Sequence, residues 1–224
     1  MWTWKAFDLN RRDCNATVLA AAALAYLPFR AGAAEPGSAP VILVVGDSLS
    51  AEYGLARGTG WVALLERRLQ EGRRTARVVN ASVSGDTTAG GRSRLAALLE
   101  RHRPALVVLE LGGNDALRGL PLETTRANLR AMIRASRDAG ARVLLLGMDM
   151  PPNYGERYRA QFRAVYTDLA QEEKVALVPF FLAGVADGPQ AAALFQDDRI
   201  HPNERAQPIL LDNVWPALRR LLKP

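Results

Sequence analysis

Cysteine and histidine are scarce in this chain: its 224 residues include one cysteine and two histidines. Cys14 lies in an N-terminal segment that we expect to be removed, which leaves a mature chain without thiols, disulfides or cysteine metal ligands. A usual zinc site needs a cluster of His, Cys or carboxylate ligands, and two distant histidines do not supply one. The sequence therefore excludes a cysteine nucleophile, disfavours a metallohydrolase and predicts no cofactor.

A large excess of charge of one sign is also missing. The chain has 29 basic and 23 acidic residues, and without residues 1–34 the balance is 25 against 21, or +4. The arginines are scattered along predicted helices, as is typical of solvated helix faces. Nucleic-acid binding needs a focused basic stripe with stacking aromatics, and the sequence has none. We expect no nucleic-acid partner, whereas a weak contact with an anionic membrane surface stays open.

An apolar stretch near the N-terminus, residues 16–29, is too short to span a bilayer comfortably. Arg11 and Arg12 precede it and small residues follow it, a pattern typical of a secretory signal. An A-x-A site ending at Ala33 predicts cleavage before Ala34 or one residue later. The paired arginines also resemble a twin-arginine signal, while the general export route and an uncut membrane anchor stay open as alternatives.

We therefore divide the chain into a signal peptide at residues 1–34, a short linker at 35–40 and one folded domain at 41–224. The protein would be exported, either to the periplasm or out of the cell. A domain of this length can build a single hydrophobic core without disulfides.

Apolar runs alternate with helical patterns along the domain, which predicts parallel strands joined by helices. The expected strands are Val41–Val45, Arg77–Ala81, Leu106–Leu109, Val143–Leu146 and Val175–Val178. The expected helices are Trp61–Leu69, Arg92–Arg101, Glu123–Ala139, Glu156–Glu173 and Ala206–Leu222, the last with Pro208 and Pro216 as candidate bends. The predicted fold is a three-layer α/β/α sandwich with about five parallel strands.

Polar, glycine-rich segments follow the first three predicted strands, at residues 46–50 (GDSLS), 82–87 (SVSGDT) and 112–115 (GGND). A fourth polar cluster, residues 197–203 (DDRIHPN), lies near the C-terminus. Ligands of such sheets bind beyond the carboxyl ends of the strands, so the side chains of these segments can converge at one edge.

Ester hydrolysis needs a nucleophile, a base and a group that orients the base, and Ser48 can be the nucleophile. His201 is the better candidate for the base, because His102 enters the third strand at its amino end, which is the wrong edge. Asp198 lies three residues before His201, a spacing that places its carboxylate beside the imidazole in a single turn. The neighbouring Asp197 is the less favoured alternative.

The backbone N–H groups of Ser48 and Gly85, with the side-chain amide of Asn114, can form an oxyanion hole. Taken singly, such residues are common in turns and caps, and only their joint occurrence in this order favours a catalytic site. Asp47 and Asp115 are expected to hold loops through backbone hydrogen bonds. The nucleophile elbow of α/β-hydrolases is disfavoured, since a serine stands where the second glycine of G-x-S-x-G should be.

These residues resemble the four sequence blocks of the SGNH (GDSL) hydrolase superfamily, whose letters correspond to Ser48, Gly85, Asn114 and His201. The match covers nearly all of residues 41–222 and is strongest to the bacterial thioesterase I, lysophospholipase and arylesterase subgroup. The resemblance implies the flavodoxin-like SGNH fold and a serine esterase that acts on acyl esters, thioesters or lysolipids. Supporting stretches are NASVSGDT (80–87), ELGGND (110–115) and QDDRIHPN (196–203).

The same resemblance implies that the segment after the fourth strand, Met150 to Tyr158, is a substrate-binding loop that includes Pro152, Asn153 and Tyr154. Tyr154 can equally be a packing aromatic. Two residues depart from the pattern of the subgroup: Glu52 replaces a small residue, and Arg199 replaces a common glycine between the triad Asp and His.

Two other functions stay open. A carbohydrate O-deacetylase on the same fold would favour a small polar acyl pocket, and a catalytically inactive binding module would keep the fold alone. Acyl chain length, leaving group and oligomeric state do not follow from the sequence.

Overall fold

The computed structural model describes residues 39–72 and 76–222. The predicted signal peptide, residues 1–34, lies outside the described residues, as does most of the predicted linker. The described part forms one compact unit that begins at Ala39.

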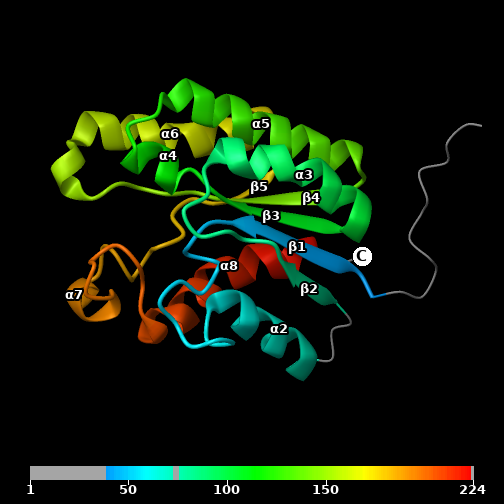
Figure 1. Ribbon diagram of the computed structural model, residues 1–224, viewed down its shortest axis with the longest axis horizontal. Helices are drawn as coiled ribbons and strands as arrows, with labels where there is room; N and C mark the ends of the chain where they lie inside the picture. The colour runs from blue at the N-terminus through cyan, green and yellow to red at the C-terminus, as the bar shows by residue number, and fades with distance from the viewer. Residues whose placement is uncertain (1–38, 73–75, 223–224) are drawn as a thin grey trace, which may run out of the picture. The chain divides into compact units, whose positions relative to one another are not determined.

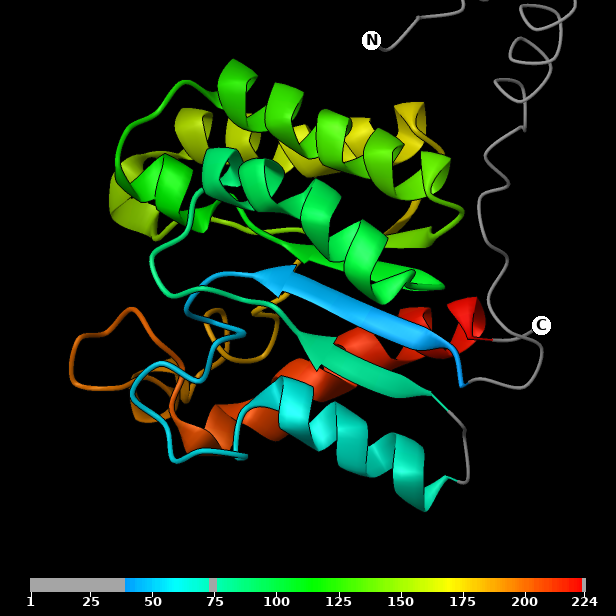
Figure 2. The ribbon, with the colours of Figure 1, turned by 45° about the vertical axis from the view of Figure 1, so that its right-hand side comes forward.

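Five parallel strands form one sheet in the order β2-β1-β3-β4-β5 (Figures 1 and 2). Their bounds are β1 Val41–Gly46, β2 Arg77–Asn80, β3 Leu106–Glu110, β4 Arg142–Leu146 and β5 Ala176–Val178. β1 and β3 lie side by side, and their register pairs Gly46 with Glu110 at the carboxyl edge. This edge, toward which all the strand arrows point, lies on the left in Figure 1.

Helices cover both faces of the sheet, as Figure 2 shows. α2 (Trp61–Glu71) and α8 (Gln207–Leu221) pack together on one face. α3 (Thr88–His102), α5 (Leu122–Asp138) and α6 (Glu156–Glu172) cover the other face. The predicted three-layer α/β/α fold with five parallel strands is therefore confirmed.

The sheet is the centre of the hydrophobic core. Every residue of β3 is buried, as are residues 42–46 of β1, which explains why both strands read as continuous apolar runs rather than alternating ones. Trp61, Phe162 and Phe181 are fully buried between the sheet and its helices. Among the described residues, no helix is both long and apolar enough to cross a membrane.

The predicted start of one helix at the carboxyl edge was wrong. α3 begins at Thr88 rather than Arg92, because Thr87 caps it by accepting a hydrogen bond from the N–H of Gly90. The two glycines in the first turn hid this start, although Gly91 allows close packing: a Cβ there would lie 2.3 Å from the side chain of Leu111.

The segment expected as a loop after the third strand contains a short helix, α4 (Gly113–Leu117). Three other short helices were not predicted: η1 (Pro152–Tyr154), α7 (Ala191–Leu194) and η2 (Glu204–Ala206). α8 continues through Pro216. Pro208 lies in its first turn, where a proline needs no N–H.

Candidate active site

Ser48 lies in a tight turn directly after β1. The carbonyl of Asp47 accepts hydrogen bonds from the N–H groups of Ser50 (3.2 Å) and Ala51 (2.9 Å). The Asp47 carboxylate also accepts from the N–H of Leu49 (3.0 Å), which fixes the turn from its inner side. The serine is therefore presented at the carboxyl edge of the central strand by a backbone that its preceding residue holds in place.

Asp198 and His201 belong to a second turn, which is closed on itself. Phe195 and Pro202 form an antiparallel bridge, and the N–H of Gln196 donates to the carbonyl of His201 at 2.8 Å. Inside the turn, Asp198 Oδ1 accepts from the N–H groups of Ile200 (2.9 Å) and His201 (3.0 Å). The acid and the base are consequently oriented by their own short segment.

The two turns bring the three predicted triad side chains together. His201 Nε2 lies 2.9 Å from Ser48 Oγ, and His201 Nδ1 lies 2.6 Å from Asp198 Oδ2. The carboxylate accepts the Nδ1 proton, so Nε2 can accept the proton of the serine hydroxyl. Asp197 is exposed, and His102 lies at the end of α3, which returns to the amino edge of the sheet.

The local hydrogen bonds keep Asp198 ionised. Partial desolvation acts to raise its pKa, but the N–H of His201, the imidazole and the N–H of Ile200 outweigh it and lower the pKa to about 2. A carboxylate that stays charged at every working pH stabilises the imidazolium that forms when His201 takes a proton.

Gly85 adopts a left-handed backbone with φ of 77°, which a residue with a Cβ rarely takes. Its N–H and that of Ser48 have no acceptor among the described residues. Both amide hydrogens are thus available to a negatively charged oxygen.

Asn114 lies in α4 and joins the loops of the two other oxyanion-hole candidates. Its Nδ2 donates to Asp47 Oδ2 and to the carbonyl of Asp86, each at 3.0 Å. Asp47 precedes Ser48, and Asp86 follows Gly85, so the three predicted donors are gathered around one amide. An oxyanion at this point competes with Asp47 and Asp86 for the Asn114 hydrogens.

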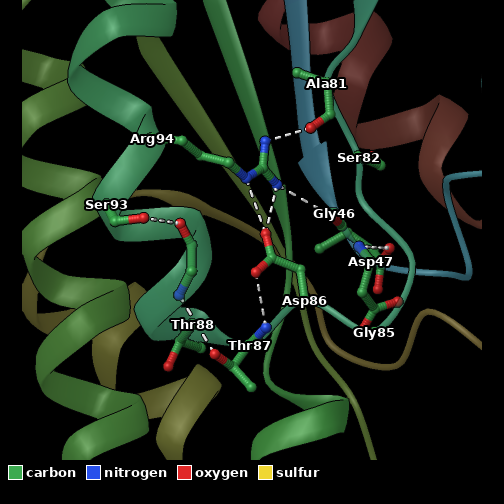
Figure 3. A network of polar contacts seen from close by, with 12 residues as sticks. Gly46, Asp47, Ala81, Ser82, Gly85, Asp86, Thr87, Thr88, Ser93 and Arg94 are labelled. Atoms are coloured by element: carbon green, nitrogen blue, oxygen red, sulfur yellow. Dashed lines mark hydrogen bonds and ion pairs between the residues drawn. The ribbon is translucent and has the colours of Figure 1, made fainter.

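Arg94 of α3 clamps the loop that carries Gly85, as Figure 3 shows. Its guanidinium pairs with the Asp86 carboxylate at 2.8 Å and donates to the carbonyl of Ala81. It also reaches the carbonyl of Gly46, at the end of β1 (3.4 Å). One half-buried side chain therefore ties the Gly85 loop to the strand that carries the nucleophile.

A pair of buried carboxyl groups lies beneath the nucleophile turn. Asp47 is 2 % exposed and Glu110, the last residue of β3, is fully buried. Glu110 Oε2 accepts from Ser50 Oγ (2.6 Å) and from the N–H of Asp47 (3.3 Å). Ser50 Oγ in turn accepts from the indole N–H of Trp61 (3.1 Å). Glu110 thus lies at the bottom of a polar network that reaches the turn of Ser48 through Asp47 and Ser50.

Burial raises the pKa of Asp47 to about 6, against the hydrogen bonds from Leu49 and Asn114 that lower it. Burial raises the pKa of Glu110 well above its usual value, and the adjacent Asp47 carboxylate raises it further. Glu110 Oε1 is buried without a hydrogen-bond partner, which would be costly for an ionised carboxylate. Glu110 is therefore the member of the pair that holds a proton more tightly.

The backbone is fitted closely to this buried acid. A Cβ at position 46 would lie 2.6 Å from Glu110 Oε2 and 2.9 Å from Ser50 Oγ, so the glycine before Asp47 leaves room for the Glu110 carboxyl group. Sequence reasoning assigned no role to Glu110 or Arg94. A carboxylate that ends an otherwise apolar buried strand was the available signal for Glu110.

Asp115 holds a loop as expected, since its carboxylate accepts from the N–H (2.8 Å) and the hydroxyl of Thr88. The two departures from the family pattern also have structural roles. Glu52 has a φ of 60°, and its carboxylate accepts from the N–H groups of Gly58 and Gly60. Arg199 has a φ of 59°, a left-handed backbone that explains why glycine is common at this position.

Aromatic side chains line the rim of the site. The ring of Tyr53 lies 4.4 Å from the imidazole of His201, a contact that the sequence did not indicate. Tyr154 stacks on Tyr158 at 6.2 Å, and the Tyr158 hydroxyl reaches the carbonyl of Ala116 in α4 (3.5 Å). Pro152, Asn153 and Tyr154 form η1, are exposed and make no hydrogen bond to the triad residues.

A groove of about 540 Å³ lies between the start of α5 and α6, and none of the triad side chains lines it. The walls of this groove include Leu120, Arg126, Tyr158 and Asp168.

Among the described residues, no cluster of His, Cys, Asp and Glu has the arrangement of a metal site. The groups that the structure gathers at Ser48 are its own hydroxyl, the imidazole of His201, the carboxylate of Asp198 and amide donors.

Known proteins with the same organisation are esterases and acyl hydrolases. The chain is 55 % identical to "Esterase TesA" of Pseudomonas aeruginosa over 188 residues, which cover 84 % of this chain and 92 % of that protein. It is 45 % identical to "Thioesterase 1/protease 1/lysophospholipase L1" of Escherichia coli over 199 residues, or 89 % and 90 % of the two chains.

A crystal structure of TesA with 55 % identity superposes with a TM-score of 0.78 and covers 81 % of this chain and 99 % of that one. The GDSL-like lipase/acylhydrolase family matches residues 44–208, a range that includes Ser48, Gly85, Asn114, Asp198 and His201. The chain is thus a member of the GDSL-like lipase/acylhydrolase family, that is, of the SGNH hydrolases.

Proposed function

We propose that this enzyme hydrolyses carboxylic esters and thioesters through an acyl-enzyme on Ser48. The observation that carries the proposal is the continuous chain from Ser48 Oγ to His201 Nε2 (2.9 Å) and from His201 Nδ1 to Asp198 Oδ2 (2.6 Å). These are the contacts that convert a weakly nucleophilic hydroxyl into an attacking group at neutral pH.

In the first half-reaction, Ser48 Oγ attacks the acyl carbonyl carbon while His201 Nε2 takes the hydroxyl proton. The N–H groups of Ser48 and Gly85 and the Asn114 amide stabilise the oxygen that becomes negative. When the tetrahedral intermediate collapses, the alcohol or thiol leaves with the proton from His201. Water then attacks the acyl-enzyme with His201 as its base, which releases the acid and restores Ser48.

The proposed substrates are small acyl esters, thioesters or lysolipids, because the relatives are named as esterase, thioesterase and lysophospholipase. η1, with Pro152, Asn153 and Tyr154, is proposed to contact the acyl group. The N-terminal pattern of residues 1–34 supports export, so the natural substrates would be those found outside the cytosol.

The test is Ser48→Ala with Ser84→Ala as its matched control, since Ser84 is an exposed serine of the neighbouring loop. Hydrolysis of p-nitrophenyl esters of graded chain length, a lysophospholipid and an acetylated sugar would be measured, together with labelling by a fluorophosphonate. We expect Ser48→Ala to lose both turnover and labelling, and Ser84→Ala to keep them. Full turnover by Ser48→Ala would refute the mechanism, and cleavage of the acetylated sugar alone would replace the substrate class by O-acetyl carbohydrates.

A further inference from the structure

The three donors proposed for the oxyanion hole come from three separate segments of the chain. The N–H of Ser48 follows β1, the N–H of Gly85 lies in the loop between β2 and α3, and the amide of Asn114 belongs to α4. Such donors stabilise a charged oxygen best when they are held in place before the reaction begins. The relative positions of the three segments therefore decide how well the donors act together.

Arg94 of α3 contacts the Gly85 loop near both of its ends and also the end of β1 (Figure 3). Its Nε and Nη2 atoms lie 2.9 and 2.8 Å from Asp86 Oδ2, and its Nη1 donates to the carbonyl of Ala81. Nη2 also reaches the carbonyl of Gly46, the last residue of β1, at 3.4 Å. A planar guanidinium with several donors thus spans the loop and connects it to the strand that precedes the nucleophile.

Asp86 transmits this contact to two of the three donors. Its carboxylate pairs with Arg94, while its carbonyl accepts from Asn114 Nδ2 at 3.0 Å. Its own N–H donates to the carbonyl of Val83 at 3.0 Å, which closes the turn that contains Gly85. Because Asp86 directly follows Gly85, a displaced Asp86 would move the Gly85 N–H and the Asn114 amide together.

The ion pair between Arg94 and Asp86 is largely buried. The two side chains are 24 % and 12 % exposed, so water and salt screen this pair less than they screen a surface pair. The other carboxylate oxygen, Asp86 Oδ1, accepts from the N–H of Thr87 at 3.0 Å. A Cβ at Gly90 would lie 1.8 Å from this oxygen, so the first turn of α3 leaves room for the carboxylate. The surrounding backbone therefore keeps Asp86 where Arg94 can reach it.

We propose that Arg94 is a positioning residue, which holds the Gly85 and Asn114 donors of the oxyanion hole in place. Arg94 acts through Asp86 and two carbonyl groups, not on the reacting atoms. The alignment matters most once the carbonyl oxygen of the substrate has become negative, so loss of Arg94 should raise the energy of the transition state more than that of the bound ester. The inference deepens the proposed esterase function and rests on it.

Hydrolysis of p-nitrophenyl acetate by the full-length chain tests this role. We expect Arg94→Ala to lower kcat about 10²-fold while KM stays within about twofold, the pattern of an interaction made only in the transition state. Arg94→Lys keeps a positive charge near Asp86 but lacks the fork of donors that reaches the two carbonyl groups, and should lower kcat about tenfold. Rates are counted per serine that a fluorophosphonate labels to completion, so that unfolded molecules do not contribute.

The matched control is Arg101→Ala, which removes an exposed arginine from the last turn of the same helix. It should leave kcat and KM within about twofold of the unchanged chain. An equal loss in this control would overturn the proposal, because the effect would then follow from the charge or the stability of α3 and not from the contacts of Arg94.

Binding of an alkyl trifluoromethyl ketone reports on the oxyanion hole directly. Ser48 Oγ adds to the ketone carbon, its proton passes to His201, and the ketone oxygen becomes the oxyanion. The affinity for this inhibitor should fall in Arg94→Ala by about the same factor as kcat/KM. An unchanged affinity, or an effect on hydrolysis confined to KM, would overturn the proposal.

A kcat of Arg94→Ala within about threefold of the unchanged chain would overturn it as well. If Arg94→Ala does not fold, Arg94→Lys and Asp86→Asn, which weakens the same ion pair from its other side, are judged by the same kinetic pattern. No ester hydrolysis by the unchanged chain would instead contradict the proposed esterase function, a result distinct from any loss confined to the variants.

Discussion

Carboxyl groups lie on both sides of Ser48, and their pKa values are shifted in opposite directions. Asp198 lies at the surface in a turn whose N–H groups and imidazole lower its pKa to about 2. Asp47 lies under the nucleophile, where burial raises its pKa to about 6, next to the more strongly perturbed Glu110. The same chemical group is thus a permanent charge on one side and part of a proton-sharing pair on the other.

The difference comes from the balance of desolvation and hydrogen bonding. Asp198 receives three hydrogen bonds while it remains partly in water, so its charged form is favoured. Glu110 has lost all contact with water and has one oxygen without a partner, so its neutral form is favoured. The exposed side therefore serves the charge that develops on His201, while the buried side holds the geometry of the turn.

Replacing the exposed acid should have the largest effect. Asp198→Asn removes the acceptor of the Nδ1 proton and favours the tautomer that cannot accept from Ser48, so kcat should fall by about 10³–10⁴. The neighbouring change Asp197→Asn is the matched control and should leave kcat within twofold. Steady-state hydrolysis of an aryl ester measures both, and equal losses would mean that the contact at 2.6 Å is not what orients the base.

Asp47→Asn should have the next largest effect. An amide at this position can still accept from the N–H of Leu49, but its NH₂ group would then face the NH₂ group of Asn114, which the carboxylate now accepts at 3.0 Å. The displaced Asn114 amide would no longer serve an oxyanion, and kcat should fall by about 10²–10³. An unchanged kcat with an unchanged KM would show that Asn114 is held by Asp86 alone.

The buried acid should also make stability depend on pH. The folded state raises the pKa of Asp47 from 3.8 to about 6, so it binds this proton more tightly than the unfolded chain does. That contribution is complete below pH 3.8 and is lost as the pH rises through about 6, which amounts to roughly 2–3 kcal/mol. Asp198 contributes in the opposite direction, because its pKa is lowered in the folded state. Its contribution to stability is present above pH 3.8 and is lost as the pH falls through about 2.

Thermal unfolding between pH 4 and 7 measures this contribution. Asp47→Asn should flatten the decline in the free energy of unfolding over that range, whereas Asp197→Asn, an exposed control, should not. A decline of equal size in both variants would assign it to other groups, Glu110 among them.

Glu110→Gln should have the smallest effect, although this residue is the most deeply buried acid of the site. If Glu110 is already neutral, an amide of the same shape can accept from Ser50 and from the N–H of Asp47, so kcat should stay within about threefold. Glu110→Ala, by contrast, leaves the hydroxyl of Ser50 without its acceptor and opens a cavity, and should lower the free energy of unfolding by about 2–4 kcal/mol. A collapse of kcat in Glu110→Gln would mean that the residue acts as a charge.

The exposed side could be predicted from the sequence, whereas on the buried side only the loop-holding role of Asp47 could be. Asp198 and His201 lie three residues apart in one turn, and a local spacing is enough to place one beside the other. Glu110 and Asp47 are 63 residues apart and meet because β1 and β3 are neighbours in a register that pairs Gly46 with Glu110. That register depends on the packing of the whole sheet, which a linear pattern does not contain.

The same reason separates the helices that were predicted well from those that were not. α5 and α6 are long and periodic, and their predicted bounds differ by one residue at most at each end. α4 is five residues long and begins at a glycine, so no periodicity could reveal it. Its formation depends on contacts with distant residues, such as the hydrogen bonds that Asp115 accepts from Thr88 of α3.

The small bridge between Phe195 and Pro202 has a consequence for the heat tolerance of catalysis. The bridge closes the segment that holds both Asp198 and His201. Thermal motion of the surrounding loops should therefore move these two residues together. Only the gap between that pair and the serine on the far loop then varies. On warming, the contact between Ser48 Oγ and His201 Nε2 should therefore be lost first. Activity should fall at temperatures where the contact between His201 and Asp198 is still intact.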